Sequence, residues 1–307
     1  MSHGEPITVV GGGLVGSLVA LILARRGYNV TLLERWLDFR ESAAAPKSIN
    51  LVLTSRGLRA IELLGGGLKD EMLELAVPVT GRIMHQTTGE VVRQPYGKDD
   101  SEFNHSISRL GLNKFLLDKA EANGVKVQFE TSVLDYDVDR EILTLDRGIP
   151  DSMCGRSGVC AKAVRSKMKV QGRLIACDGV GSNIRAALQK RGHLTSTNEL
   201  LPAGYMELSF PKRTSEGILA RQGLHIWPRD THFIMALSNL DGSFTGTLYM
   251  PKDGDLSFAA LKSAGPTAVA AFMREHYPDA IPMMGGIDAI CEEFAKNPVG
   301  CVNRPNL

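Results

Sequence analysis

Three glycines and one acidic residue near the amino terminus have the types and spacing of a phosphate-binding site. Gly11, Gly13 and Gly16 fit the pattern G-x-G-x-x-G, and Glu34 lies 18 residues after Gly16. Glycines let the backbone approach a pyrophosphate, N–H groups of a following helix donate to it, and a carboxylate accepts hydrogen bonds from a ribose diol. The pattern predicts a dinucleotide site. By itself it does not distinguish FAD from NAD, because both contain adenosine, ribose and pyrophosphate.

Arg82 and Tyr96 have side chains suited to binding a carboxylate. A guanidinium binds a carboxylate through two parallel hydrogen bonds, and a phenol can donate a third. The two residues are 14 positions apart, on either side of a turn-like segment at 87–89. Two antiparallel strands would bring both side chains to one pocket if the turn preserves the register. On spacing alone, a surface arginine and a core tyrosine explain the pair better.

Two further polar segments lie at the boundaries of predicted elements. Ser108 and Arg109 open a predicted helix with leucines at 112, 116 and 117, and Asp178 and Gly179 follow a predicted strand over 174–177. A strand-end aspartate places its carboxylate at the carboxyl edge of the sheet, where α/β proteins bind ligands, and the glycine allows close approach. The alternative for Asp178 is a turn capped by its side chain.

The elements that must position these residues change along the chain. A strand over 7–10, a helix over 14–26 and a strand over 29–33 predict a β-α-β unit, and a helix over 112–122 followed by a strand over 125–129 continues the alternation. From Pro202 the sequence consists of short strand-like runs, without long helical patterns. These runs predict an antiparallel sheet and cover 205–210, 224–227, 232–237 and 244–250.

Composition favours small-molecule chemistry. The 307 residues carry a formal charge of +1, with 43% hydrophobic and 22% charged residues, which gives no electrostatic case for nucleic acid or an anionic membrane surface. The five cysteines are odd in number and lack zinc-type spacing, so a reducing compartment is expected and a metal site is not. No stretch approaches the length of a membrane helix. The basic segment 147–169 is expected to be a solvated surface insertion.

Several segments resemble the kynurenine 3-monooxygenases, a family of flavoprotein aromatic hydroxylases. The similarity follows the family's order and spacing from Ile7 to about Pro282. The matching segments are KSINL at 47–51, GRIMH at 81–85, QPYG at 94–97, GYMEL at 204–208 and LHIWPR at 224–229. The Ser108-Arg109 and Asp178-Gly179 positions also match signatures of these hydroxylases.

The resemblance implies an α/β fold, in which a Rossmann-type FAD-binding domain is joined to a second, mainly antiparallel β substrate domain. The FAD-binding domain would cover 1–200, with about 76–104 contributing to the substrate domain. The substrate domain would cover 201–290, and 291–307 would be a truncated end. The implied reaction is the hydroxylation of L-kynurenine to 3-hydroxykynurenine with NADPH and dioxygen, in tryptophan degradation and NAD biosynthesis.

The resemblance also assigns site residues. Arg82 and Tyr96 match the residues that bind the substrate's carboxylate, and no side chain is given a catalytic or metal-binding role. The positions expected to contact FAD are Gly11, Gly13, Val15, Gly16, Leu33, Glu34, Arg35, Val52, Arg109, Val133, Asp178 and Asn183.

Family members continue beyond this length, with a Gly-Asp motif that closes on the flavin and further substrate contacts. The sequence therefore resembles the amino-terminal two-thirds of the family, and a chain of this extent is expected to hydroxylate kynurenine poorly or not at all. The alternatives are a catalytically inactive FAD-binding remnant, another FAD-dependent aromatic hydroxylase or an NAD-dependent reductase. Full-length eukaryotic members lie on the cytosolic face of the mitochondrial outer membrane, whereas this chain alone is expected to be cytoplasmic and soluble.

Overall fold

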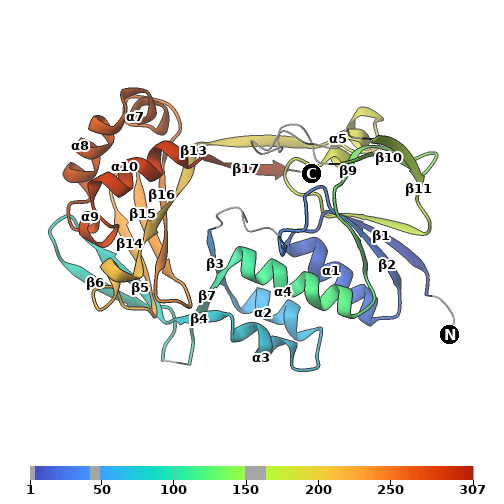
Figure 1. Ribbon diagram of the computed structural model, residues 1–307, viewed down its shortest axis with the longest axis horizontal. Helices are drawn as coiled ribbons and strands as arrows, with labels where there is room; N and C mark the ends of the chain where they lie inside the picture. Colours follow the sequence, from blue (N-terminus) through green and yellow to red (C-terminus); the bar gives the residue numbers. More distant parts are fainter. Residues whose placement is uncertain (1–3, 42–48, 100, 149–163, 307) are drawn as a thin grey trace.

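The computed structural model describes residues 4–41, 49–99, 101–148 and 164–306. Figure 1 shows two regions side by side: a dinucleotide-binding region at the amino-terminal end, on the right, and a sheet covered by helices on the left. The long strands β13 (Thr197–Phe210) and β17 (Gly300–Asn306) run along the top between them. Most of the basic segment, 149–163, lies outside the described residues.

The dinucleotide-binding region is built on a parallel sheet with the order β12-β1-β2-β8. Its central strands are buried on both sides, as Val9 and Leu32 show with no exposed surface, and apolar runs of this kind are typical of parallel sheets. Helices α1 and α4 pack on it, where Leu21 and Leu116 are buried. The elements are β1 (Pro6–Val10), α1 (Leu14–Arg25), β2 (Asn29–Leu33), α4 (Arg109–Ala122), β8 (Lys126–Gln128) and β12 (Arg173–Ala176).

Two small antiparallel sheets flank this core, with the orders β3-β7-β4 and β11-β10-β9. Strand β11 is the described end of the basic segment, so this end is part of a regular sheet, although its side chains are largely exposed. The elements are β3 (Asn50–Leu53), α2 (Ser55–Glu62), α3 (Leu68–Leu73), β4 (Ala76–Val79), β7 (Asn104–Ser108), β9 (Thr131–Asp137), β10 (Ile142–Arg147), β11 (Val164–Lys169) and α5 (Asn183–Lys190).

The second region contains a seven-stranded sheet with the order β17-β13-β16-β15-β14-β5-β6. Only the β14–β5 pair is parallel, so the sheet is mainly antiparallel. Strands β5 and β6 come from the first hundred residues and extend a sheet formed by residues beyond 196. Its further elements are β5 (Gly81–His85), β6 (Val91–Pro95), α6 (Lys212–Ser215), β14 (Gly223–Pro228), β15 (Phe233–Ser238) and β16 (Phe244–Pro251).

The two faces of this sheet differ because side chains alternate along each strand. One face carries Trp227, Ile234 and Leu248, which are fully buried under helices α7 to α10. The other face carries Arg82, Leu224 and other residues, and is not covered by these helices. The helices are α7 (Phe258–Ala264), α8 (Pro266–His276), α9 (Ala280–Met283) and α10 (Ile287–Lys296).

The structure contains a helix layer, α7 to α10, beyond residue 257, where the sequence showed strand-like runs without long helical patterns. The helices are short, and glycines at 265 and 286 with positive φ separate them, so no single long periodic run marks them in the sequence. The segment 291–307, expected to be a truncated end, contains part of α10 and all of β17, and Phe294 of α10 is buried in the core.

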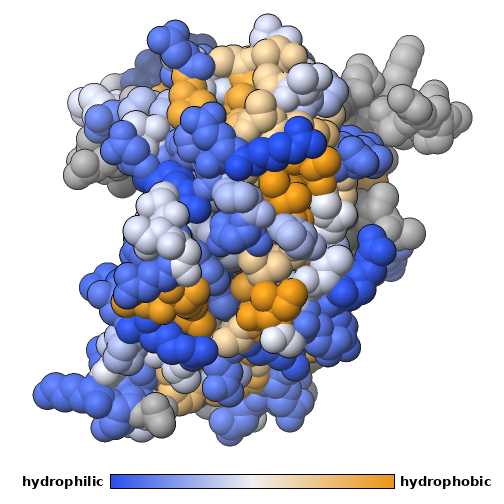
Figure 2. All heavy atoms as spheres, turned by 90° about the vertical axis from the view of Figure 1, so that its left-hand side faces the viewer, coloured by the Kyte–Doolittle hydropathy of each residue, from blue (hydrophilic) through white to orange (hydrophobic). Residues whose placement is uncertain are grey.

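Figure 2 shows the side of the molecule formed by this helix layer and strands β5 and β6. Hydrophobic residues appear there as separate patches among hydrophilic ones, so this face has no broad apolar surface. Within the described ranges, no helix combines the length and the apolar character needed to cross a membrane.

A buried hydrogen-bond cluster joins the two regions. The Asn50 side-chain amide of β3 donates to the Ser238 carbonyl oxygen at 3.2 Å and to Asn239 Oδ1 at 2.7 Å. Ser106 Oγ of β7 donates to the same Ser238 carbonyl at 2.9 Å. Buried polar groups of this kind are costly unless paired, so the cluster ties the end of β15 to the β3-β7-β4 sheet in one arrangement.

Candidate functional site

The glycine turn lies between β1 and α1, where each glycine has a separate reason. Gly11 has φ +99° and donates its N–H to the Leu33 carbonyl oxygen at 2.8 Å. A Cβ on Gly16 would collide with the Gly11 carbonyl oxygen, so the first turn of the helix can approach the strand only with glycine there. A Cβ on Gly13 would meet none of the described atoms within 4 Å. The turn is therefore closed on the protein side and open at Gly13.

Glu34 is buried, and both of its carboxylate oxygens accept hydrogen bonds from the backbone. Oε2 accepts from the Gly12 N–H at 2.6 Å, and Oε1 accepts from the Trp36 N–H at 2.9 Å. The carboxylate was predicted to accept hydrogen bonds from a ribose diol. Each of its oxygens retains a further lone pair that could accept such a bond. In this structure it also fixes the glycine turn to the end of β2.

The predicted residues beyond β2 lie around this turn. Cys177 donates its N–H to the Val10 carbonyl oxygen at 2.7 Å, which places Asp178 and Gly179 beside Gly11. Asp178 Oδ2 accepts from the Ile184 N–H of α5 at 3.3 Å. The aspartate thus lies at the carboxyl edge of the parallel sheet and also binds the start of the next helix.

The remaining predicted FAD contacts differ in what they can present to a ligand. Leu33 and Val133 are buried in the core, so only their backbone is available. The Val133 carbonyl accepts from the Asn183 amide at 2.8 Å. Three of the others are exposed: Val15 in the first turn of α1, Arg109 in the first turn of α4 and Arg35 just after β2. Val52 in β3 is partly buried.

Arg82 and Tyr96 lie together on the uncovered face of the seven-stranded sheet. Strands β5 and β6 form an antiparallel hairpin in which Arg82 pairs with Gln94, and the Tyr96 N–H donates to the Thr80 carbonyl oxygen at 3.0 Å. The turn therefore preserves the register. The guanidinium carbon lies 5.5 Å from the centre of the Tyr96 ring, and Arg82 Nη1 lies 3.4 Å from Gln94 Oε1. Burial raises the pKa of the Tyr96 phenol, against an opposing effect of Arg82, so the hydroxyl stays protonated and can donate at neutral pH.

An apolar cluster adjoins this pair on the same face. Tyr96 packs with Val52 of β3 and with residues of β14 and β15. Val52 is a predicted FAD contact and Tyr96 a predicted substrate contact, so the cluster brings the two predicted sites into contact. Its members are Val52, Val79, Tyr96, Leu224, Ile226, Met235 and Leu237.

A pair of histidines lies behind Arg82, on the helix-covered face. His225 Nε2 donates to the Ala220 carbonyl oxygen at 3.0 Å, so His225 Nδ1 accepts the proton of His85 Nε2 at 2.9 Å. Burial lowers the pKa of His225 to about 4 and lowers the pKa of His85. The His85 ring stacks on Trp227 with centroids 4.2 Å apart. Both histidines are therefore neutral near pH 7, and their hydrogen bond joins β5 to β14 on the helix-covered face.

A family model described as an FAD binding domain matches residues 5–254. The chain belongs to the FAD-binding domain family. The match covers the glycine turn, Glu34, Asp178 and the β5–β6 hairpin, so FAD is the dinucleotide that this family predicts for the open side of the turn.

Two curated relatives of this FAD-binding chain are bacterial enzymes. The kynurenine 3-monooxygenase of Myxococcus xanthus (strain DK1622) is 40% identical over 300 residues, which cover 96% of this chain and 60% of that protein. The kynurenine 3-monooxygenase of Cytophaga hutchinsonii is 37% identical over 295 residues, with 96% and 62% covered. These matches confirm the resemblance stated above. The chain spans about three-fifths of the length of these relatives.

Solved structures confirm the predicted fold. The tetrameric form of 2-methyl-3-hydroxypyridine-5-carboxylic acid oxygenase superposes with a TM-score of 0.70 at 18% identity, over 99% of this chain and 71% of that one. The tetracycline destructase Tet(51) gives a TM-score of 0.61 at 13% identity, with the same shares covered. At such identities the likeness shows the fold alone, a Rossmann-type FAD-binding part joined to a mainly antiparallel sheet.

The residues around the turn fit the pyrophosphate and ribose of FAD. The open space beside Gly13 would be filled by a side chain on any other residue. The start of α1 has no side-chain cap in the described structure, which leaves its first N–H groups available to an anion. Val15 is 65% exposed at this helix start and Val180, beside Gly179, is 47% exposed, so apolar surface adjoins the donors.

Sequence reasoning missed the residues that orient the turn from behind. Ser17 Oγ and the Asn113 amide both donate to the Gly12 carbonyl oxygen, at 3.0 and 3.1 Å. The only sequence signal for Asn113 was that it is a polar residue among the leucines at 112, 116 and 117. Nothing in the sequence identified its partner, which lies 101 residues away.

Glu34→Gln should weaken FAD binding and also reduce the stability of the free protein. A glutamine amide has one accepting oxygen, so its NH₂ group would face the N–H of either Gly12 or Trp36. We expect a loss of about 1–3 kcal/mol in the free energy of unfolding, measured by denaturant titration without FAD, together with a higher Kd for FAD. Glu90→Gln, on the exposed β5–β6 turn, is the control. Unchanged stability and affinity for Glu34→Gln would mean that this carboxylate does not organise the turn.

Proposed function

We propose that this chain binds FAD and the substrate in a flavin-dependent aromatic hydroxylase that acts on L-kynurenine. In this reaction kynurenine, dioxygen, NADPH and a proton give 3-hydroxykynurenine, NADP⁺ and water. Support comes from membership of the FAD-binding domain family and from the identity to kynurenine 3-monooxygenases, in which this chain covers about three-fifths of the length.

The observation that carries the choice of substrate is the Arg82–Tyr96 pair beside an apolar cluster. Kynurenine has an α-amino-acid carboxylate at one end and an aromatic ring at the other. A guanidinium and a protonated phenol on one face of β5 and β6 suit the carboxylate. The neighbouring Leu224, Ile226 and Met235 suit the ring. Val52, a predicted FAD contact, belongs to the same cluster, so a ring bound there would lie beside the predicted flavin site.

In this proposal the protein's own groups orient the substrate and exclude water. Arg82 and Tyr96 bind the carboxylate, which fixes the direction in which the ring extends over the apolar cluster. FAD held at the glycine turn and Glu34 would supply the redox chemistry between NADPH, dioxygen and the ring. The apolar side chains remove water from the reacting ring, which favours coupled turnover over release of hydrogen peroxide.

Cofactor extraction and a kynurenine titration test the proposal. We expect the denatured chain to release FAD, identified by chromatography against FAD, FMN and NAD standards. We also expect kynurenine to perturb the absorbance spectrum of the FAD-loaded chain at saturable concentrations. Release of NAD without flavin would contradict the cofactor. A spectral response to other aromatic acids but not to kynurenine would keep the flavin assignment and reject the substrate.

A further inference from the structure

The Gly12 residue of the turn is bound at both of its peptide groups. Its N–H donates to Glu34 Oε2 at 2.6 Å. Its carbonyl oxygen accepts from Ser17 Oγ at 3.0 Å and from the Asn113 amide at 3.1 Å. Ser17 is fully buried, and its Oγ also lies 3.4 Å from Asn113 Oδ1. Two donors from two helices therefore converge on a single backbone oxygen.

This arrangement fixes the direction of the next N–H group. The described residues contain no cis peptide bond, and in a trans peptide the C=O and the N–H of one unit point in opposite directions. Because the Gly12 carbonyl points back toward α1 and α4, the Gly13 N–H points to the other side. The same residue also borders open space, since a Cβ on Gly13 would meet no described atom within 4 Å.

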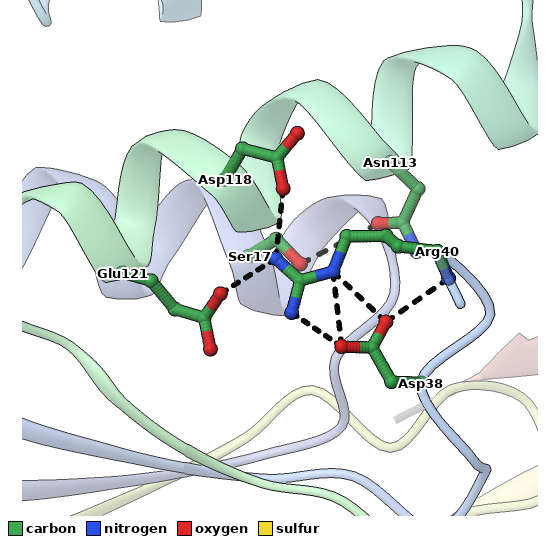
Figure 3. A network of polar contacts seen from close by, with 6 residues as sticks. All are labelled: Ser17, Asp38, Arg40, Asn113, Asp118 and Glu121. Atoms are coloured by element: carbon green, nitrogen blue, oxygen red, sulfur yellow. Dashed lines mark hydrogen bonds and ion pairs between the residues drawn. The ribbon is translucent and has the colours of Figure 1, made fainter.

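A second set of contacts joins α4, the helix of Asn113, to the loop after β2. Figure 3 shows Arg40, which follows β2, between Asp38 of its own loop and two carboxylates of α4. Arg40 Nη1 lies 2.8 Å from Asp118 Oδ1 and 2.6 Å from Glu121 Oε2, and its Nη2 lies 2.6 Å from Asp38 Oδ2. Its side chain is only 18% exposed, and its bond to Asp38 lowers the pKa of that carboxyl. The network joins α4 to the loop after β2, one turn or more beyond Asn113.

We propose that Asn113, together with Ser17, is a positioning residue for the pyrophosphate of the bound dinucleotide. It acts through Gly12: by binding the carbonyl oxygen from behind, it presents the Gly13 N–H to the pyrophosphate. The inference rests on the proposed FAD binding and deepens it. It names Asn113, which is far from the glycine motif in the sequence, as a residue that sets the donor geometry of that motif. Donors that are already oriented bind an anion more tightly, because binding then carries no further entropic cost of ordering them.

The test compares FAD affinity in four variants of the intact chain. Ser17→Ala and Asn113→Leu each remove one donor, and the double variant removes both. Asn123→Ala is the matched control, since Asn123 is the C-cap residue of the same helix and its amide also donates to a backbone carbonyl, that of Lys119, at 2.8 Å. Each protein is titrated with FAD, with ADP and with adenosine, and its thermal denaturation is recorded without ligand.

We expect each single variant to raise the Kd for FAD and ADP about 5-fold or more and the double variant to raise it at least about 20-fold, because the remaining donor compensates in the single variants. Adenosine, which has no phosphate, should bind all variants equally, and Asn123→Ala should bind FAD like the wild type.

A merely structural role would weaken the binding of adenosine and ADP alike, and that result would overturn the proposal. Wild-type FAD affinity in the double variant would overturn it as well. If the wild-type chain binds ADP and adenosine but no FAD, the proposed function fails, and the ADP series still decides the role of Asn113. If it binds none of the three ligands, both proposals fail.

Discussion

Gly13→Ala should weaken FAD binding strongly while leaving the free protein about as stable as before. Gly13 has φ −71° and ψ −177°, which alanine adopts without strain, and the added methyl group would meet none of the described atoms within 4 Å. The methyl group would instead occupy the space that the pyrophosphate needs. We expect a cost in binding of about 1–3 kcal/mol, or about 5- to 150-fold in Kd. Fluorescence quenching of FAD measures the affinity.

The stability of the free variant separates this effect from misfolding. As an N-cap, alanine stabilises the folded protein less than glycine by up to about 1 kcal/mol. It also lowers the entropy of the unfolded chain, which stabilises the folded protein by a similar amount of about 0.4–1 kcal/mol. Gly16→Ala is the contrasting variant, since its Cβ would collide with the Gly11 carbonyl oxygen and should destabilise the protein even without ligand. Wild-type affinity in Gly13→Ala would show that the pyrophosphate does not cross this turn.

Arg82→Ala should weaken kynurenine binding and leave FAD affinity nearly unchanged. Arg82 lies on the uncovered sheet face next to Tyr96, whereas the glycine turn that would bind the pyrophosphate belongs to the other sheet. Loss of a two-point contact between a guanidinium and a carboxylate should cost about 2–4 kcal/mol, or about 30- to 1,000-fold. Calorimetry with kynurenine on the FAD-loaded protein measures Kd, and steady-state kinetics measure kcat/KM wherever turnover is observed.

Two further arginine variants make this result specific. Arg82→Lys should restore only part of the affinity, because an ammonium cannot present the planar pair of donors. Arg93→Ala is the matched control: Arg93 pairs with Ile83, so it lies on the opposite face of the same hairpin and is also exposed. If Arg82→Ala changes binding by no more than about 0.5 kcal/mol, as an ordinary surface substitution does, then Arg82 does not bind the carboxylate. The case for kynurenine would weaken with it.

The sequence alone determined the features that depend on neighbouring residues. Gly11, Gly13 and Gly16 predict a tight turn between a strand and a helix because their backbone requirements are local. The strands at 29–33 and 244–250 were predicted closely, since alternation and β-branched residues act over a few positions. The turn at 87–89 likewise predicted the hairpin that brings Arg82 and Tyr96 together. The helices beyond residue 257 were missed, because short amphipathic helices become stable only against the sheet that they cover.

Only the tertiary structure decided which distant side chains complete the site. Asn113 is one of several polar residues of α4, and only the packing of α4 beside α1 brings its amide to the Gly12 carbonyl. Glu34 reads in the sequence as a ribose acceptor, and the fold adds its bonds to Gly12 and Trp36. Val52 and Tyr96 share one apolar cluster only because β5 and β6 join strands from beyond residue 196. Apart from the Glu34–Trp36 bond, these contacts join residues more than 20 positions apart. Their geometry is set by packing, which no local pattern encodes.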